Sequence, residues 1–202
     1  MALSGNTTVT SESDCWIDPI KVVDVENISG QPAREGWTAN DCALNVKYCR
    51  IYAEDHPDAG QYVDKDEDPW SMFVMGNYRR NTQGKIEDWG GAFKVRTFLE
   101  ACGCSGQFTD DEGALDMKIV NSCINKNVFK VSYKSTDINN DGKNAVKTWS
   151  GRIFQTKAGA IKAWKKSLNT GWPKDYIGHP HNQSMEGRTG ETIPETQFPS
   201  DL

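Results

Sequence analysis

Asp137, Asn139 and Asp141 place three side-chain oxygens at alternate positions of one short segment, and Gly142 follows them directly. An EF-hand calcium loop begins in this way, with oxygen ligands at odd positions and a glycine where the chain turns sharply. Such a loop also needs a bidentate glutamate at its twelfth position, where this chain has Thr148. The sequence therefore favours a polar turn, with a calcium loop of another type as the alternative.

The segments on either side of this turn alternate between apolar and polar residues and are rich in β-branched and aromatic side chains. They cover residues 128–134 and 145–154. This alternation predicts two strands rather than two helices. The dipeptide Asp141-Gly142 between them is a strong hairpin signal, because glycine accepts the positive φ of a tight turn. We therefore predict a β-hairpin here.

The net charge of −5 over 202 residues is unevenly distributed along the chain. Residues 117–174 hold 12 Lys and Arg side chains and only two acidic ones, Asp137 and Asp141, which gives a balance of +10. A basic block in an otherwise acidic chain indicates a localised anionic partner. The alternative is that this block packs beside the acidic half of the chain, so that the two neutralise each other.

The predicted hairpin carries both kinds of side chain that bind a nucleic-acid single strand. Proteins of this kind combine basic groups for the phosphates with aromatic faces on which bases stack. We expect Lys130, Lys134, Lys147 and Arg152 to contact phosphates and Trp149 to stack on a base. Strict alternation puts Arg152 on the face opposite Trp149, so its role requires a bulge in that strand.

A third predicted strand, residues 70–80, ends in Tyr78, Arg79 and Arg80, which we add to the expected nucleic-acid interface. For each aromatic residue, packing in the core is the alternative, since large aromatic side chains are mostly buried. For each basic residue, the alternative is protection of a strand edge against aggregation.

The remaining segments predict a β-rich α+β fold. Further strands are expected at residues 16–25 and 42–52, and helices at 91–103, after a capping box at Thr109 and Glu112, and at 158–168. About five strands with one or two inserted helices and a C-terminal amphipathic helix suit an OB-like five-stranded barrel. We assign residues 1–14 to a disordered arm, 15–170 to this domain and 171–202 to a flexible acidic tail.

Six cysteines are present, and none of them forms a C-x-x-C pair. Cys42, Cys49, Cys102 and Cys104 do not match the usual zinc spacings, so we expect no metal site, with zinc as the alternative. The chain has no apolar run of membrane-spanning length, and its first residues do not resemble a signal peptide. We therefore expect a cytoplasmic protein, without a membrane partner, whose cysteines are reduced.

Several segments together resemble the single-stranded-DNA-binding proteins of bacteriophage replication and recombination. They are F-V-M-G-N-Y-R-R, A-F-K-V-R-T-F-L-E-A-C-G and I-N-K-N-V-F-K-V-S-Y-K with its return strand, followed by an acidic tail ending in T-Q-F-P-S-D-L. The resemblance implies an OB-like barrel that binds single strands with little sequence preference, without catalysis or a cofactor. It also implies that the tail, with Phe198, Asp201 and Leu202, contacts replication or recombination proteins.

Two other classes of protein stay open. A virion structural protein, such as a capsid or tail component, would also be a β-rich domain with polar arms, and it would form stable oligomers. A metal-dependent nuclease would use the acidic segment D-K-D-E-D, residues 64–68, together with His56. No nucleophile–base pair or phosphate-binding glycine loop is visible in the sequence, so we expect a non-catalytic protein. The sequence leaves open a preference for DNA or RNA and the formation of a homo-oligomer.

Overall fold

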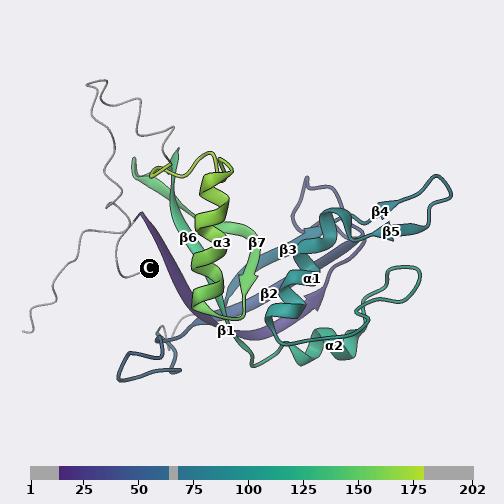
Figure 1. Ribbon diagram of the computed structural model, residues 1–202, viewed down its shortest axis with the longest axis horizontal. Coiled ribbons are helices and arrows are strands. Elements are labelled where there is room, and N and C mark those ends of the chain that lie inside the picture. Colours follow the sequence, from purple (N-terminus) through teal and green to yellow (C-terminus); the bar gives the residue numbers. More distant parts are fainter. Residues whose placement is uncertain (1–13, 64–67, 180–202) are drawn as a thin grey trace, which may run out of the picture.

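The computed structural model describes residues 14–63 and 68–179 and contains a strongly curled antiparallel sheet that forms a half-barrel (Figure 1). The strand order is β3-β2-β1-β6-β7, and every pair is antiparallel. The bounds are Cys15–Asn27 for β1, Cys42–Arg50 for β2, Trp70–Gly76 for β3, Asn127–Ile138 for β6 and Asn144–Phe154 for β7. The predicted β-rich architecture is confirmed.

The inner face of the sheet forms the main core. Ile20, Val22, Leu44, Val46 and Val74 are fully buried there. Successive side chains of a strand point to opposite faces, so an apolar residue at every second position gives each strand one buried face. A bulge in β1, after Val22, shifts its register against β2 and increases the local twist.

The segment between β3 and β6 holds two short strands and the inserted helices. These are β4 (Arg79–Arg80), β5 (Ile86–Asp88), the 3₁₀ helix η1 (Gly90–Ala92), α1 (Phe93–Ala101) and α2 (Met117–Ser122). Helix α1 lies over the sheet and buries Val95, Phe98 and Leu99 in the main core (Figure 1). The apolar positions that predicted this helix therefore form its buried face.

The predicted strand 70–80 is interrupted, which corrects the sequence analysis. Strand β3 ends at Gly76, and Arg79–Arg80 pairs with β5 in a separate two-stranded sheet. The backbone of Gly91 lies directly against Gly76, and a Cβ atom at position 76 would overlap the Gly91 carbonyl. This close approach requires glycine and ends the regular strand there.

The start of the second inserted helix also differs from the prediction. Thr109 is in an isolated bridge with Leu115, and the helix is capped by Asp116, whose carboxylate accepts a hydrogen bond from the Lys118 amide at 2.8 Å. The residues between form a turn around Asp110, whose Oδ1 accepts hydrogen bonds from two backbone amides. Helix α2 is therefore capped by the side chain of Asp116, and not by the predicted capping box at Thr109 and Glu112.

Helix α3 (Lys157–Asn169) covers a second, smaller core on the β6–β7 side of the sheet (Figure 1). Ala160 and Trp164 are buried against Cys15, Tyr133 and Trp149. The helix begins at Thr156, whose side chain accepts a hydrogen bond from the Gly159 amide. The predicted amphipathic helix at 158–168 is confirmed.

The domain extends beyond the predicted boundary at residue 170. The Thr136 amide donates to the Asp175 carbonyl at 2.7 Å, and the Ile177 amide donates to the Lys134 carbonyl at 3.0 Å. His179 is 4% exposed. Residues 171–179 therefore belong to the domain rather than to a tail, because their backbone groups pair with β6. Phe198, Asp201 and Leu202 lie outside the described residues, as does the arm up to residue 13.

None of the helices in the described part of the chain has the length and apolar character needed to cross a membrane.

Candidate nucleic-acid interface

The turn between β6 and β7 is a hairpin turn, as predicted. Asn139 Oδ1 accepts hydrogen bonds from the amides of Asp141 and Lys143, both at 3.0 Å. Gly142 has φ +74°, the left-handed conformation that favours glycine. The oxygen that a calcium loop would use at Asn139 therefore holds the turn together instead.

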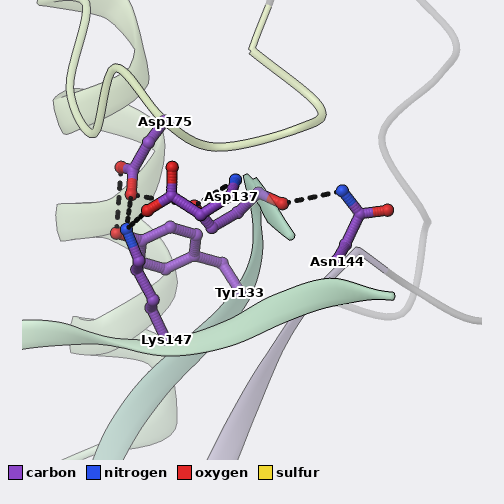
Figure 2. Close-up of polar contacts among 6 residues, drawn as sticks. Tyr133, Asp137, Asn144, Lys147 and Asp175 are labelled. Carbon is purple, nitrogen blue, oxygen red and sulfur yellow. Dashed lines mark hydrogen bonds and ion pairs between the residues drawn. The ribbon is translucent and has the colours of Figure 1, made fainter. Parts of the chain in front are cut away.

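Lys147, predicted to bind phosphate, is held between two carboxylates (Figure 2). Its Nζ lies 2.6 Å from an oxygen of Asp137 and 2.6 Å from an oxygen of Asp175. Tyr133 and Ser135 also donate hydrogen bonds to Asp175, at 3.1 and 3.0 Å. These contacts fix residues 171–179 on the hairpin and compensate the charge of Lys147.

Protonation within this cluster follows its hydrogen bonds. The hydrogen bonds to Asp137 and Asp175 raise the pKa of Lys147. Burial alone would raise the pKa of Asp175, but the hydrogen bonds from Lys147, Ser135 and Tyr133 outweigh it and lower that pKa. Burial and the neighbouring Asp175 raise the pKa of Tyr133 to about 12. At neutral pH the cluster therefore contains a lysine cation, a charged Asp175 and a neutral tyrosine.

Lys130 is buried, which contradicts its predicted position on a solvent-facing surface. Its Nζ donates to Asp18 at 2.7 Å and to Ser132 Oγ at 2.7 Å, and lies 5.8 Å from the centre of the Tyr48 ring. Only 6% of Lys130 is exposed. The predicted alternation of β6 is right, but both faces of this strand are covered: one by α3, the other by the curled sheet itself. Ser132 is 1% exposed, so its hydroxyl is not accessible as a nucleophile beside this lysine.

Trp149 is also buried, so the prediction that its ring stacks on a base is wrong. It is 7% exposed and packs between Phe154 and Trp164, with ring centroids 6.0 and 5.2 Å away. Its neighbours come from strand β7, through Phe154, and from helix α3, through Trp164. The core-packing alternative for this residue is therefore the one that holds.

Arg152 does reach the Trp149 ring, through the bulge that this prediction required. In the pairing with β6, residues 149–152 of β7 lie opposite Val131 alone. The guanidinium carbon of Arg152 lies 4.6 Å from the Trp149 ring centre and 5.7 Å from that of Phe93. Arg152 itself is exposed. Lys134, the fourth predicted cation of the hairpin, forms an ion pair with Asp14 at 3.3 Å.

The three residues predicted to join the nucleic-acid interface at the end of β3 do not form one surface. Tyr78 is 7% exposed, and its hydroxyl donates to the Gly113 carbonyl at 2.9 Å, which contradicts a stacking role. Arg79 is exposed and pairs with Asp88 at 3.2 Å. Arg80 pairs with Asp41 at 3.3 Å and donates to the Gly84 carbonyl. Both arginines lie on the small β4–β5 hairpin, which is separate from the main sheet.

The four cysteines weighed for zinc do not gather at a single site. Cys42 and Cys49 lie at opposite ends of β2, seven residues apart, which is about 23 Å along an extended strand. Burial raises the pKa of Cys42 to about 11. Within residues 14–63 and 68–179, no group of three or more His, Cys, Asp or Glu side chains is arranged to hold a metal ion.

A cation–aromatic stack that the sequence analysis did not identify lies on the outer face of the sheet. Arg34 and Trp37, in the β1–β2 loop, meet Phe73 of β3. The Arg34 guanidinium carbon lies 5.4 Å from both ring centres, and the ring centroids are 6.3 Å apart. Trp37 is 46% exposed. The sequence feature that could have indicated this stack is a tryptophan in the polar segment Q-P-A-R-E-G-W.

The basic block contributes a second exposed surface through α3. Lys157, Lys162 and Lys166 are exposed, and none of the ion pairs within the described residues involves them. Beyond the helix, Trp172 is 56% exposed, and Lys174 Nζ lies 5.3 Å from its ring centre. The charge excess of residues 117–174 thus reaches the surface mainly on α3, rather than on the hairpin.

No protein-family model, curated protein or solved structure matches the chain. The resemblance to phage single-stranded-DNA-binding proteins stays a prediction.

Proposed function

We propose that the protein binds single-stranded DNA without catalysis and that the strand lies across the β1–β2 loop and the outer face of β3. The stack of Arg34 on Trp37 and Phe73 carries this proposal. An exposed indole offers a base a face to stack on, and a guanidinium beside it can contact the adjoining phosphate. Arg34 and Trp37 already contact each other in the structure, and a preformed contact lowers the entropic cost of binding.

The arrangement of the strands supports the same surface. The half-barrel has three consecutive strands, an insertion with helices and a returning hairpin, in the order β3-β2-β1-β6-β7, and this arrangement is consistent with an OB-type barrel. Barrels of that type bind oligonucleotides on the face of their second and third strands and on the adjoining loops. The corresponding parts here are β2, β3 and the loop that carries Trp37.

The lysines of α3 support the proposal through long-range electrostatics. Exposed cations on one surface raise the local concentration of a polyanion and its rate of association. Three of the four hairpin cations predicted to bind phosphate are instead paired with Asp14, Asp18, Asp137 or Asp175. We therefore place base stacking at Trp37 instead of Trp149, and we assign the electrostatic attraction of DNA to the lysines of α3.

The test is a fluorescence-anisotropy titration of labelled oligo-dT and of a duplex of equal length, with the parent protein and with Trp37→Ala. We expect the parent to prefer the single strand and Trp37→Ala to lose about 1–3 kcal/mol of binding free energy, the value of one stacked base. Trp70→Ala is the matched control, because Trp70 is 52% exposed but lies at the other end of β3.

Each outcome bears on a separate part of the proposal. A parent protein that binds neither oligonucleotide at low salt would refute the function, and a virion structural role would then be the leading hypothesis. A folded Trp37→Ala variant that binds like the parent would refute the surface. An equal loss with Trp70→Ala would show a general effect of removing exposed aromatic rings.

A further inference from the structure

Three cysteines meet where the end of α1 approaches the end of α2. Cys104 Sγ lies 3.7 Å from Cys123 Sγ, and the hydroxyl of Ser122 lies 3.3 Å from Cys104 Sγ. Cys102 also hydrogen-bonds with Cys123. Cys102 and Cys123 are buried, whereas Cys104 is partly exposed. Two thiols 19 positions apart in the sequence are thus in van der Waals contact.

The local backbone holds this geometry. Gly103 has φ +84°, and the Cys104 amide donates to the Leu99 carbonyl at 3.0 Å, so the chain turns back at the end of α1. Cys123 is the C-terminal cap of α2, and its Sγ lies 3.7 Å from the Ile119 carbonyl. Cys104 therefore follows the end of α1, Cys123 caps the end of α2, and their sulfurs lie 3.7 Å apart, compared with about 2.05 Å in a disulfide.

We infer that Cys104 and Cys123 form a reversible disulfide, with Cys104 as the thiol that reacts first. Cys104 lines a hollow of about 430 Å³ together with Trp89, Arg96 and Phe108, and a small reagent can reach it there. This inference does not depend on the proposed DNA binding.

The oxidant is a low-molecular-weight disulfide. The Cys104 thiol loses its proton to solvent, and the thiolate attacks one sulfur of the reagent and releases the other as a thiol. Cys123 then loses its proton and attacks Cys104 Sγ, which releases the second reagent thiol. One disulfide forms and one is reduced, so two protein thiols are oxidised and two reagent thiols are produced.

Protonation sets the rate of this exchange. Burial raises the pKa of Cys104, and the hydrogen bond with Cys102, together with burial, raises that of Cys123. Only the thiolate attacks a disulfide, so the exchange is slow at neutral pH and accelerates as the pH rises. Outside this cluster, Cys42 and Cys49 lie at opposite ends of β2, and burial raises the pKa of the Cys15 thiol to about 12.

The experiment incubates the full chain with glutathione disulfide, blocks residual thiols by alkylation and maps peptides without reduction. We expect one crosslink, between the peptides of Cys104 and Cys123, to form faster at higher pH. The oxidised protein should melt about 5–10 °C higher than the reduced one, because the bond closes a loop of about 20 residues.

Variants separate this pair from the other thiols. Cys104→Ser should abolish the crosslink, and Cys49→Ser should leave it unchanged. Cys104 is partly exposed, so its serine variant keeps the assay usable even where Cys123→Ser fails to fold. A stable glutathione adduct on Cys104, a crosslink between Cys102 and Cys123, or no oxidation of the folded parent would each overturn the assignment.

Discussion

Two regions of the molecule pair an arginine with a tryptophan, yet they differ in what covers the indole ring. Arg152 lies over Trp149 at 4.6 Å, and Arg34 lies over Trp37 at 5.4 Å. Trp149 is 7% exposed because α3 covers that side of the hairpin, whereas Trp37 is 46% exposed on the outer face of the sheet. The same pair of residue types therefore stabilises a core in one region and forms an accessible surface in the other.

The basic residues of the two regions differ in the same way. Lys130, Lys134 and Lys147 all contact carboxylates, so their charges are compensated within the protein. Arg34 contacts two aromatic rings and keeps its guanidinium beside an exposed indole. An excess of positive charge in the sequence therefore does not identify a binding surface, because the partner of each cation decides whether its charge is available.

The largest expected effect is on stability, from Trp149→Ala. Removing a buried tryptophan leaves a cavity and should lower the free energy of unfolding by about 3–5 kcal/mol, measured by urea denaturation. Trp37→Ala is the matched control and should cost about 1 kcal/mol or less, since its ring is half exposed. Equal losses for the two variants would contradict the distinction between core and surface.

Lys130→Ala should have the next largest effect, about 3 kcal/mol of unfolding free energy, because it leaves the carboxylate of Asp18 largely buried and unpaired. Lys162→Ala, on the exposed face of α3, should stay within about 0.5 kcal/mol. The measurement is again urea denaturation. If Lys130→Ala were as stable as the parent, the buried ion pair would not hold in solution.

The sequence predicted the strands, the hairpin turn and two of the helices because their signals are local. Alternation, an Asp-Gly turn and apolar spacing depend only on residues close together in the chain. The covering of each face depends on distant residues instead. Asp18, the partner of Lys130, is 112 positions away, and Asp175, the partner of Lys147, is 28 positions away in a segment expected to be a tail.

The candidate site was mispredicted for the same physical reason. Periodicity correctly separated the two faces of β6, but it could not show that the sheet curls enough to cover the second face. The stack of Arg34, Trp37 and Phe73 depends on a loop folding against a strand 36 residues beyond Trp37. No local pattern encodes that contact, so only a solitary tryptophan in a polar loop could have indicated it.

A smaller effect is expected from acid. The pKa of Asp175 is lowered in the folded state, so its contribution to stability is present above the ordinary value of 3.8 and is lost as the pH falls through the folded value. Asp175→Asn should cost about 1 kcal/mol at neutral pH. It should also lose less stability than the parent on acidification. The measurement is the free energy of unfolding of both proteins by urea denaturation at several pH values. If the two free energies fell in parallel with pH, Asp175 would not be stabilised by its hydrogen bonds in the folded protein.

The smallest expected effect is on the salt dependence of DNA binding, and it tests the two regions side by side. Arg34→Gln removes a cation that we place on a phosphate, so the slope of log affinity against log salt should fall by about 0.7 in magnitude, the single-strand value for one contact. Lys147→Gln removes a cation that already lies between two carboxylates, so its slope should match that of the parent. Titrations of oligo-dT at several salt concentrations give both slopes, and circular dichroism shows that each variant is folded. The opposite result would be a reduced slope for Lys147→Gln and an unchanged slope for Arg34→Gln. It would show that Lys147 leaves Asp137 and Asp175 when DNA binds, and that the phosphate contacts lie on the β6–β7 hairpin.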